Sequence, residues 1–325
     1  MDDGPDSRVS FHDLAPRQES FAEAVAAGLA RHRKSISPRF LYDEAGAALF
    51  GRITELEEYY PTRTEVGILT AHAAEIAAVL GPDAELIEFG ASSSSKARIL
   101  LRALERPAAY VPIDVSADHL RQAARDIAAD FPRLKVVAVC ADYTQPFDLP
   151  EELLAAARRV GFFPGSTIGN LQPGEAVDFL SLWASQLGPG GGMIVGVDLK
   201  KDPQLLHNAY NDARGVTAAF STNLLARANR ELDADFDLSA FRHDARYNPE
   251  QGRIEINVRS LRDQTVRVSG RAFRFAAGEP LHTEYSYKYT VEEFAALARR
   301  SGFESRRVWT DPQQLFSVHW LAIAG

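Results

Sequence analysis

The stretch Glu85-Leu86-Ile87-Glu88-Phe89-Gly90-Ala91-Ser92-Ser93-Ser94-Ser95-Lys96 decides the fold of this chain. Residues 85–90 are mainly apolar and predict a buried strand, and residues 96–104 have helical spacing. The loop of small residues between them lets a ligand approach the backbone closely. Strand, small-residue loop and helix in this order are typical of the first unit of a nucleotide-binding sheet.

The alternation of strands and helices continues for more than 100 residues on the C-terminal side of this stretch. Further strands are expected at 109–113, 134–140, 160–163 and 193–197, with helices at 117–130 and from Pro173. Such alternation predicts an α/β fold with a parallel, doubly wound, Rossmann-like sheet. Ligands bind such sheets at the carboxyl ends of the strands, where the strand order reverses.

The rest of the chain predicts a second domain. Capping boxes at Ser20–Glu23 and Thr290–Glu293 open two helices, which we expect to end near His32 and Gly302. Outside the alternation we also expect helices at 45–56, 202–213 and 217–231, and one that follows the segment 59–65 and ends near residue 80. Strands are expected at 253–260, 265–268, 273–275, 306–309 and 316–322. The segment 59–65 is expected to interrupt the N-terminal helices. We therefore expect a flexible N-terminal tail at 1–18, a Rossmann-like domain at 64–200 and 290–325, and a second domain at 19–63 and 201–289.

Composition excludes several classes of protein. Lys and Arg number 36 against 44 Asp and Glu, a net charge of -8, so the chain lacks the basic footprint of a nucleic-acid binder and is repelled by anionic lipid. With Cys140 as the only cysteine, no intramolecular disulfide can form. No histidines stand at H-x-x-x-H spacing, so we expect no metal. The chain shows neither a secretory signal nor an apolar run of about 20 residues, and we expect a cytoplasmic protein.

The loop after the first strand indicates which ligand the sheet binds. Gly90 is its only glycine, so the loop matches neither the G-x-G-x-x-G pattern of a dinucleotide site nor a Walker A loop. A ligand without a phosphate, such as S-adenosylmethionine (SAM), fits better. The alternative is a small-residue turn that only permits tight packing.

The ends of the next three strands carry polar groups. Asp114 can accept hydrogen bonds from both hydroxyls of a ribose, or it can cap the following helix. Asp142, followed by Tyr143, can accept from an adenine amino group, or it is a solvated loop acid. The loop after the fourth strand ends at Asn170, which both donates and accepts, although Gly and Asn also favour an ordinary turn.

Several strings of the sequence resemble the SAM-dependent L-histidine Nα-methyltransferase family of ergothioneine biosynthesis. They are Phe40-Leu41-Tyr42-Asp43, Glu58-Tyr59-Tyr60-Pro61-Thr62-Arg63-Thr64-Glu65, Pro164-Gly165-Ser166-Thr167-Ile168-Gly169-Asn170, Gly215-Val216-Thr217-Ala218-Ala219-Phe220 and Thr283-Glu284-Tyr285-Ser286. The similarity runs from about residue 20 to the C-terminus. It implies a class I methyltransferase domain with a second, α+β substrate-binding domain. The implied reaction is trimethylation of the α-amine of histidine to hercynine.

The resemblance also implies which residues form the site. Those that contact SAM are Gly90, Lys96, Asp114, Asp142 and Tyr143; those that contact the amino acid are Tyr59, Asn170, Tyr210, Glu284 and Ser286. In the family, the Asn and the second-domain Tyr hold the carboxylate, and the Glu-x-Ser pair reads the imidazole. Tyr59 is the catalytic candidate that receives or steers the departing proton. Alternatively, Glu284 and Ser286 form only the polar face of a strand.

Three positions depart from the family pattern and keep other functions open. Ser92 replaces a glycine in the SAM loop, Ile256 stands where Met is frequent, and Ser221 stands where Asn is common. A methyltransferase for another amino acid and a catalytically silent SAM-binding protein therefore remain alternatives. A nicotinamide oxidoreductase is disfavoured by the missing glycines. The expected partner is a small-molecule amino acid, and the expected state is a monomer.

Overall fold

The computed structural model describes residues 8–14, 19–91, 94–153 and 158–323. The chain divides into two compact units. The first unit contains the described residues of 1–17, 63–199 and 289–325, and the second unit contains 18–62 and 200–288.

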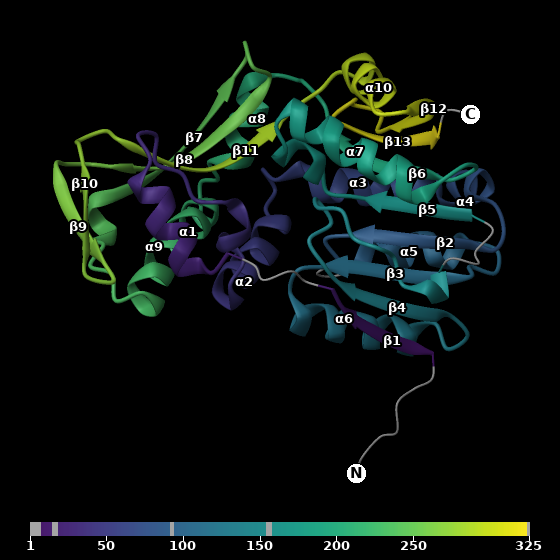
Figure 1. Ribbon diagram of the computed structural model, residues 1–325. Helices are drawn as coiled ribbons and strands as arrows, with labels where there is room; N and C mark the ends of the chain where they lie inside the picture. Colours follow the sequence, from purple (N-terminus) through teal and green to yellow (C-terminus); the bar gives the residue numbers. More distant parts are fainter. Residues whose placement is uncertain (1–7, 15–18, 92–93, 154–157, 324–325) are drawn as a thin grey trace. The chain divides into compact units, whose positions relative to one another are not determined.

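The first unit is built on an eight-stranded sheet with the order β1-β4-β3-β2-β5-β6-β13-β12 (Figure 1). Its strands are β1 Val9–Asp13, β2 Ala84–Phe89, β3 Ala109–Asp114, β4 Lys135–Cys140, β5 Arg158–Phe163, β6 Gly192–Asp198, β12 Phe303–Thr310 and β13 Phe316–Ile323. Strands β1 to β6 pair in parallel, whereas β13 runs antiparallel to both β6 and β12. The predicted α/β sheet is therefore present, with two antiparallel strands at one edge.

The strand order of this sheet reverses between β2 and β5, because β3 and β4 lie on one side of β2 and β6 lies beyond β5. The helices of the first unit are α4 Ala73–Leu80, α5 Ser95–Ala103, α6 Ala117–Asp130, α7 Pro173–Leu187 and α10 Val291–Arg300. Every residue of β2 and β6 is buried. Helices pack against this apolar sheet, so its ligand site can only lie at the strand ends.

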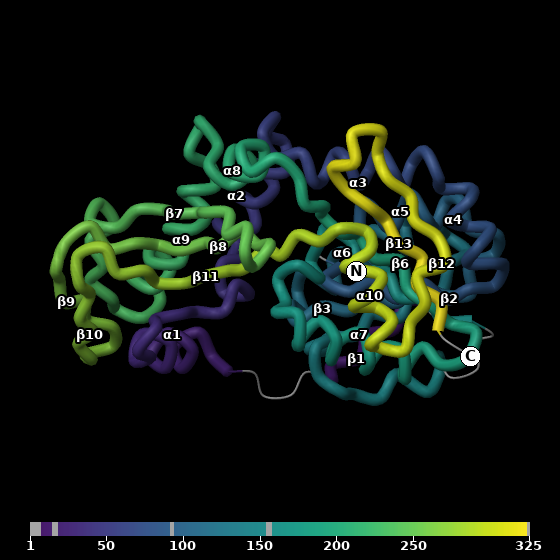
Figure 2. Tube along the Cα trace, turned by 90° about the horizontal axis from the view of Figure 1, so that it is seen from above, coloured from purple at the N-terminus to yellow at the C-terminus, as the bar shows by residue number. Residues whose placement is uncertain are grey.

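The second unit contains α1 Phe21–Ala30, α2 Glu44–Thr54, α8 Pro203–Tyr210, α9 Val216–Glu231 and two small antiparallel sheets. One sheet has the order β11-β8-β7, formed by Pro280–Tyr287, Arg253–Ser260 and Phe241–Asn248, and the other is the hairpin β9 Gln264–Val268 with β10 Arg271–Phe275. Figure 2 shows β7, β8 and β11 side by side. Burial alternates along β8, which is typical of a sheet with one covered face.

Short 3₁₀ helices and one boundary helix complete the chain. The 3₁₀ helices are η1 Pro38–Leu41, η2 Glu151–Leu153, η3 Thr167–Asn170 and η4 Leu238–Ala240. Helix α3 Tyr60–Ala71 starts at the last residues of the second unit and continues into the first. Both predicted capping boxes are present, at Ser20–Glu23 and Thr290–Glu293.

Two sequence expectations were wrong. The tail expected at 1–18 contains β1, which pairs with β4; residues 1–7 and 15–18 lie outside the described residues. Its polar side chains hid this strand, because Ser10 and His12 bond to Glu152 while Phe11 packs on the core. The expected interruption at 59–65 is mostly helical, since Pro61 lies in the first turn of α3, where proline is tolerated.

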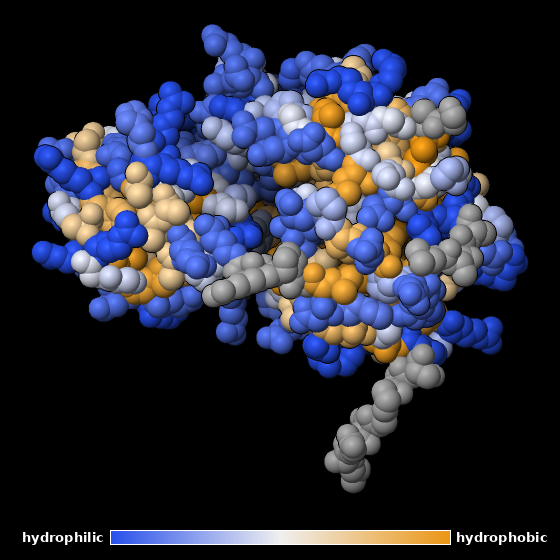
Figure 3. Space-filling view, in the orientation of Figure 1, coloured by the Kyte–Doolittle hydropathy of each residue, from blue (hydrophilic) through white to orange (hydrophobic). Residues whose placement is uncertain are grey.

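The drawn face of the molecule is mostly hydrophilic, with apolar side chains scattered between polar ones (Figure 3). Scattered apolar side chains are normal for a protein surface. Among the described residues, no helix is both long and apolar enough to cross a membrane.

Candidate active site

Gly90 follows β2 directly and has a backbone conformation that favours glycine. Its φ is +75°, and its amide donates to the carbonyl of Ile113 at 2.9 Å. A Cβ at this position would lie 3.6 Å from the Tyr143 hydroxyl. The bare backbone of Gly90 therefore leaves room between β2 and Tyr143. Ser92, the departure from the family loop, lies outside the described residues.

A buried acid that the sequence did not single out, Glu88, lies beneath this loop. Glu88 accepts a hydrogen bond from the hydroxyl of Tyr110, and the oxygen of that hydroxyl lies 2.8 Å from the Ser94 hydroxyl, from which it accepts. Burial raises the pKa of Glu88 to about 7, against the lowering effect of these hydrogen bonds. Because Ser94 precedes α5, the Glu88–Tyr110 pair supports the C-terminal end of the loop.

Asp114 is the last residue of β3 as predicted, whereas Asp142 lies two residues after the end of β4, and each carboxylate is tied to its own loop. Asp114 accepts from the Ser116 amide at 2.9 Å, and Ser116, not Asp114, is the N-cap of α6. Asp142 accepts from the amide and hydroxyl of Thr144 at 3.0 and 2.6 Å. Burial raises the pKa of Asp114. The simple N-cap interpretation of Asp114 is thus wrong, and both carboxylates are fixed in orientation.

Tyr143 belongs to an aromatic group that includes Phe89, Phe163 and Phe179, with ring centroids 5.9 to 6.2 Å from its own. Its carbonyl accepts from the indole of Trp183 at 2.9 Å. Burial, then the charges of Asp114 and Asp142, raise the pKa of the Tyr143 hydroxyl well above its ordinary value. The hydroxyl therefore remains neutral.

Asn170 closes the loop that follows β5. The turn that leads to it is fixed by Ser166, which has a φ of +55° and whose hydroxyl accepts from the Asp198 amide at 2.9 Å. Asn170 is half-buried, and no hydrogen bond joins its side-chain amide to another residue in the described part of the chain. The loop thus holds in place an amide whose donor and acceptor are available to a ligand.

The ammonium of Lys96 lies against a carboxylate that the sequence analysis did not assign. Lys96 Nζ and Glu65 Oε2 are 2.5 Å apart, and Glu65 is 1% exposed. The amide of Gly165, five residues before Asn170, donates to the same carboxylate. Both Lys96 and the loop before Asn170 are therefore anchored on Glu65.

In the second unit, Tyr210 and Ser286 form a cluster with Lys288. Tyr210 ends α8, and Ser286 lies on β11. The two hydroxyl oxygens are 2.9 Å apart, and Lys288 Nζ donates to each at 2.8 Å. Lys288 is 1% exposed. Since the ammonium only donates, both hydroxyl oxygens accept from it, and the shared bond uses one of the two hydroxyl hydrogens.

Glu284 lies two residues before Ser286 on β11, opposite Ile256 of β8. Burial raises its pKa to about 7, and the charge of Lys288 partly opposes this rise. Among the described residues, none forms a hydrogen bond or ion pair with its carboxylate. Directly opposed residues of antiparallel strands point to the same face, so Ile256 is the cross-strand neighbour of Glu284.

Tyr59 lies among aromatic rings of the second unit. Its ring meets those of Tyr210 and Phe50 edge-on, with centroids 6.2 and 6.4 Å away. The structure thus brings the predicted Tyr59, Tyr210 and Ser286 together in one unit.

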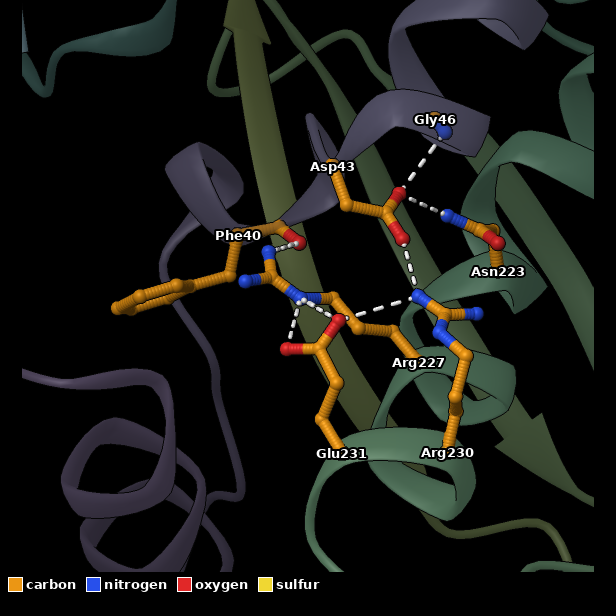
Figure 4. A network of polar contacts seen from close by, with 7 residues as sticks. All are labelled: Phe40, Asp43, Gly46, Asn223, Arg227, Arg230 and Glu231. Atoms are coloured by element: carbon orange, nitrogen blue, oxygen red, sulfur yellow. Dashed lines mark hydrogen bonds and ion pairs between the residues drawn. The ribbon is translucent and has the colours of Figure 1, made fainter. Parts of the chain in front are cut away.

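A polar network around Asp43 joins helices α2 and α9 of the second unit (Figure 4). Asp43 caps α2 by accepting from the Gly46 amide at 2.8 Å, and it also accepts from Asn223 and Arg230 of α9 at 2.7 and 2.6 Å. Burial opposes ionisation, but these hydrogen bonds together hold the pKa of Asp43 below its ordinary value. The network fixes α2, which carries Phe50, against α9.

Ser221 is connected to the backbone of Tyr210 by hydrogen bonds through His243. Its hydroxyl lies 2.9 Å from Nδ1 of His243, and Nε2 of that ring lies 2.8 Å from the Tyr210 carbonyl. A carbonyl only accepts, so Nε2 carries the proton and Nδ1 accepts from Ser221. Burial lowers the pKa of His243, which keeps the ring neutral. Ser221 therefore supports the end of α8.

Glu65 and Lys288 were not predicted from the sequence, although signals for both were present. Glu65 ends one of the strings that resemble the family, and Lys288 continues the spacing of two set by Glu284 and Ser286. Neither position was assigned a role, because the partners come from distant segments. Among the described residues, no group of three or more His, Cys, Asp or Glu residues could hold a metal ion.

Comparison with known proteins identifies the family. The family described as histidine-specific methyltransferase, SAM-dependent, matches residues 21–323. The histidine N-alpha-methyltransferase of Mycolicibacterium smegmatis is 44% identical over 92% of this chain and 94% of its own length. That of Mycobacterium tuberculosis is 41% identical over 88% of this chain and 90% of its own.

A longer relative and a solved structure with the same fold extend the comparison. Ergothioneine biosynthesis protein 1 of Neurospora crassa is 33% identical over 87% of this chain, which covers 32% of that longer protein. A SAM-dependent methyltransferase from Clostridium acetobutylicum shares the fold, with a TM-score of 0.50 at 9% identity over 86% of this chain and 99% of that one. The chain therefore belongs to the family of SAM-dependent, histidine-specific methyltransferases.

Proposed function

We propose that this protein transfers three methyl groups from SAM, one after another, to the α-amine of L-histidine and so forms hercynine for ergothioneine biosynthesis. Within a histidine-specific family, the observation that supports this most is the half-buried carboxylate of Glu284, which has no partner among the described residues. Ser286, two positions further on the same strand, adds a hydroxyl. An acceptor and a hydroxyl at this spacing match the two ring nitrogens of an imidazole.

The reaction is a direct displacement. The lone pair of the neutral α-amine forms a bond to the methyl carbon of SAM, the carbon–sulfur bond breaks, and its electron pair stays on sulfur. The enzyme mainly supplies alignment, which can lower a barrier by roughly 7–11 kcal/mol. A free α-amine is largely protonated near neutral pH, so the protein also has to accept its proton. Tyr59, or a water that it orients, steers this proton.

The residues of the first unit would bind SAM as the second substrate. Gly90 leaves the backbone open at the end of β2, Asp114 accepts from the ribose hydroxyls, and Asp142 with Tyr143 meets the adenine. The proximity of Gly90 to Tyr143, whose hydroxyl would lie 3.6 Å from a Cβ on Gly90, supports this assignment. Lys96 supplies a positive charge for the amino-acid end of SAM.

The histidine substrate would be held by groups from both sequence regions. Asn170 and Tyr210 bind its carboxylate, while Glu284 and Ser286 bind its imidazole. Lys288 keeps the hydroxyls of Tyr210 and Ser286 at a fixed spacing. A ring that is held at both nitrogens leaves the α-amine as the only nitrogen available for methylation.

Methylation of histidine with SAM carrying isotopically labelled methyl groups tests this proposal. We expect a product that is heavier by three labelled methyl groups, all of them located on the α-nitrogen by fragmentation in the mass spectrometer. Histidinol, which lacks the carboxylate, should be methylated poorly. A ring-methylated product would contradict the orientation, and efficient turnover of histidinol would remove the role of Asn170 and Tyr210.

A second candidate, methylation of another amino acid, is favoured by one observation. Ile256, which stands where the family often has Met, is the cross-strand neighbour of Glu284. Replacement Ile256→Met should leave the preference for histidine unchanged if Glu284 sets specificity. A preference that moves toward histidine only in Ile256→Met would favour this second candidate.

We further propose that the enzyme acts as a cytoplasmic monomer with a small-molecule substrate, in keeping with its acidic net charge and single cysteine. Light scattering after gel filtration tests the monomer: a mass near 35.7 kDa is expected, and twice that mass would contradict it.

A further inference from the structure

The buried carboxylate of Glu65 joins two segments of the first unit that are assigned to different ligands. Glu65 lies on α3 and is 1% exposed. Lys96, at the start of α5, donates to its Oε2 at 2.5 Å. The Gly165 amide donates to Oε1 and Oε2 at 3.0 and 2.9 Å. One carboxylate therefore holds the lysine beside the SAM loop and the loop that ends at Asn170.

The sheet leaves the carboxylate of Glu65 little freedom. A Cβ added to Gly196 of β6 would lie 2.0 Å from its Oε1, so glycine is required there for the carboxylate to sit where it does. Breaking a buried ion pair by removing one partner leaves the other charge uncompensated. Glu65 thus cannot be displaced without moving Lys96, Gly165 or both.

We infer that Glu65 is a positioning residue that sets the binding of both substrates at once. Through Lys96 it places a positive charge for the carboxylate of SAM, and through Gly165 it places Asn170 for the carboxylate of histidine. This inference rests on the proposed function for the identity of the two ligands. It adds that one side chain couples the two binding events.

Replacement Glu65→Gln tests the coupling. Glutamine removes the negative charge that pairs with the Lys96 ammonium, and it places an amide NH2 donor where one carboxylate oxygen accepts from the Gly165 amide. We expect the KM for SAM and the KM for histidine each to rise about tenfold or more, the range for loss of a charged hydrogen bond. We expect kcat to change less than about threefold, because the interaction acts on binding.

A second variant displaces the carboxylate without removing any hydrogen-bonding group. Gly196→Ala places a methyl group against Glu65 and should raise the same two KM values. Gly67→Ala is the matched control, because it lies on the same helix, two residues from Glu65, where a Cβ meets nothing within 4 Å. This control should keep both wild-type KM values.

A double-mutant cycle separates positioning from a general loss of structure. In a Lys96→Met background, Glu65→Gln should raise the KM for SAM no further but should still raise the KM for histidine. Both KM values staying within twofold of wild type in Glu65→Gln and Gly196→Ala would overturn the inference, and so would a fall in kcat alone. If the wild type fails to methylate histidine, the proposed function is wrong. Titration of Glu65→Gln with SAM by calorimetry then still tests whether Glu65 positions Lys96 for SAM.

Discussion

Glu88 and Glu284, one in each unit, are acids of the same kind in different surroundings. Burial raises the pKa of both to about 7. Glu88 accepts from the Tyr110 hydroxyl, so its desolvation is offset by the protein itself. Among the described residues, Glu284 has no such partner. A buried acid with partners stabilises a loop, whereas one without partners retains its hydrogen-bonding capacity for a ligand.

The same contrast extends to the neighbours of the two acids. In the first unit, the acids assigned to SAM are each tied to a nearby amide, as with Asp114 and Ser116. In the second unit, Lys288 orients the hydroxyls of Tyr210 and Ser286. The carboxylate of Glu284 forms no hydrogen bond or ion pair with another described residue. We therefore expect variants of the acids assigned to SAM to act on SAM binding, and variants of Glu284 and the Tyr210–Ser286–Lys288 cluster to act on the amino-acid substrate.

The largest effect is expected at Glu284. A site that hydrogen-bonds its substrate rejects an analogue lacking those groups by roughly 10⁴-fold, because the buried acceptor is left unpaired. We expect wild-type kcat/KM for phenylalanine to be lower than for histidine by about this factor. Glu284→Ala should lose most activity on histidine and keep its affinity for SAM.

Glu250→Ala is the control for that variant, since Glu250 is exposed in the turn between β7 and β8. A Glu284→Ala enzyme that still prefers histidine as strongly as the wild type would remove the contrast between the two acids. Steady-state rates on both amino acids, with SAM titrated by calorimetry, provide the measurement.

The next effect is expected at Asp114. Asp114→Ala removes a charged acceptor from the ribose hydroxyls, which should cost on the order of 1.5–3 kcal/mol of SAM binding, roughly ten- to a hundredfold in Kd. Asp126→Ala, on the exposed side of α6, should bind SAM like the wild type. Unchanged SAM affinity in a folded Asp114→Ala protein, measured by calorimetry, refutes the assignment of β3.

Lys288→Met should act more weakly and only on the amino acid. Methionine has a similar length but no ammonium, so Tyr210 and Ser286 lose their common donor. We expect the KM for histidine to rise about tenfold, as for one charged hydrogen bond, with the Kd of SAM unchanged. If the Kd of SAM rises with the KM for histidine, the assignment of the Lys288 cluster to the amino-acid substrate alone is wrong.

The last expected effect is on stability and not on substrate binding, at Glu88. The folded-state pKa of about 7 lies above the ordinary value of 4.5, so the wild type loses stability as the pH rises from 4.5 through 7. Glu88→Gln cannot ionise and keeps an acceptor for Tyr110. Its free energy of unfolding, relative to wild type, should therefore rise between pH 5 and pH 8, by on the order of 1–3 kcal/mol.

Urea unfolding at the two pH values measures this difference, and Glu105→Gln, which is exposed, should show none of it. A Glu88→Gln protein that gains nothing at pH 8 would contradict the burial of an ionisable acid beneath the loop.

The central strands could be predicted from the sequence because each is a run of mainly apolar residues with Gly or Asp after it. Strand β1 could not, since Val9-Ser10-Phe11-His12-Asp13 is polar at alternate positions and becomes a strand only by pairing with β4, more than 100 residues away. Strand β7 was missed for a similar reason, because more than half of its residues are charged or polar.

The candidate site shows the same limit. Residues at strand ends, such as Asp114 and Asp142, could be proposed because the fold places strand ends at one edge of the sheet. The partners Glu65 and Lys288 could not, because Lys96 is 31 residues from Glu65 and Tyr210 is 78 from Lys288. Local patterns carry no information about such contacts.

The most direct test of the account is a competition in which all twenty amino acids meet the wild-type enzyme and SAM in one reaction. Mass spectrometry then reads which of them gain methyl groups. We expect trimethylated histidine and negligible methylation of the other nineteen. Comparable methylation of phenylalanine or tyrosine would contradict the role of Glu284 and, with it, the claim that the second unit selects histidine.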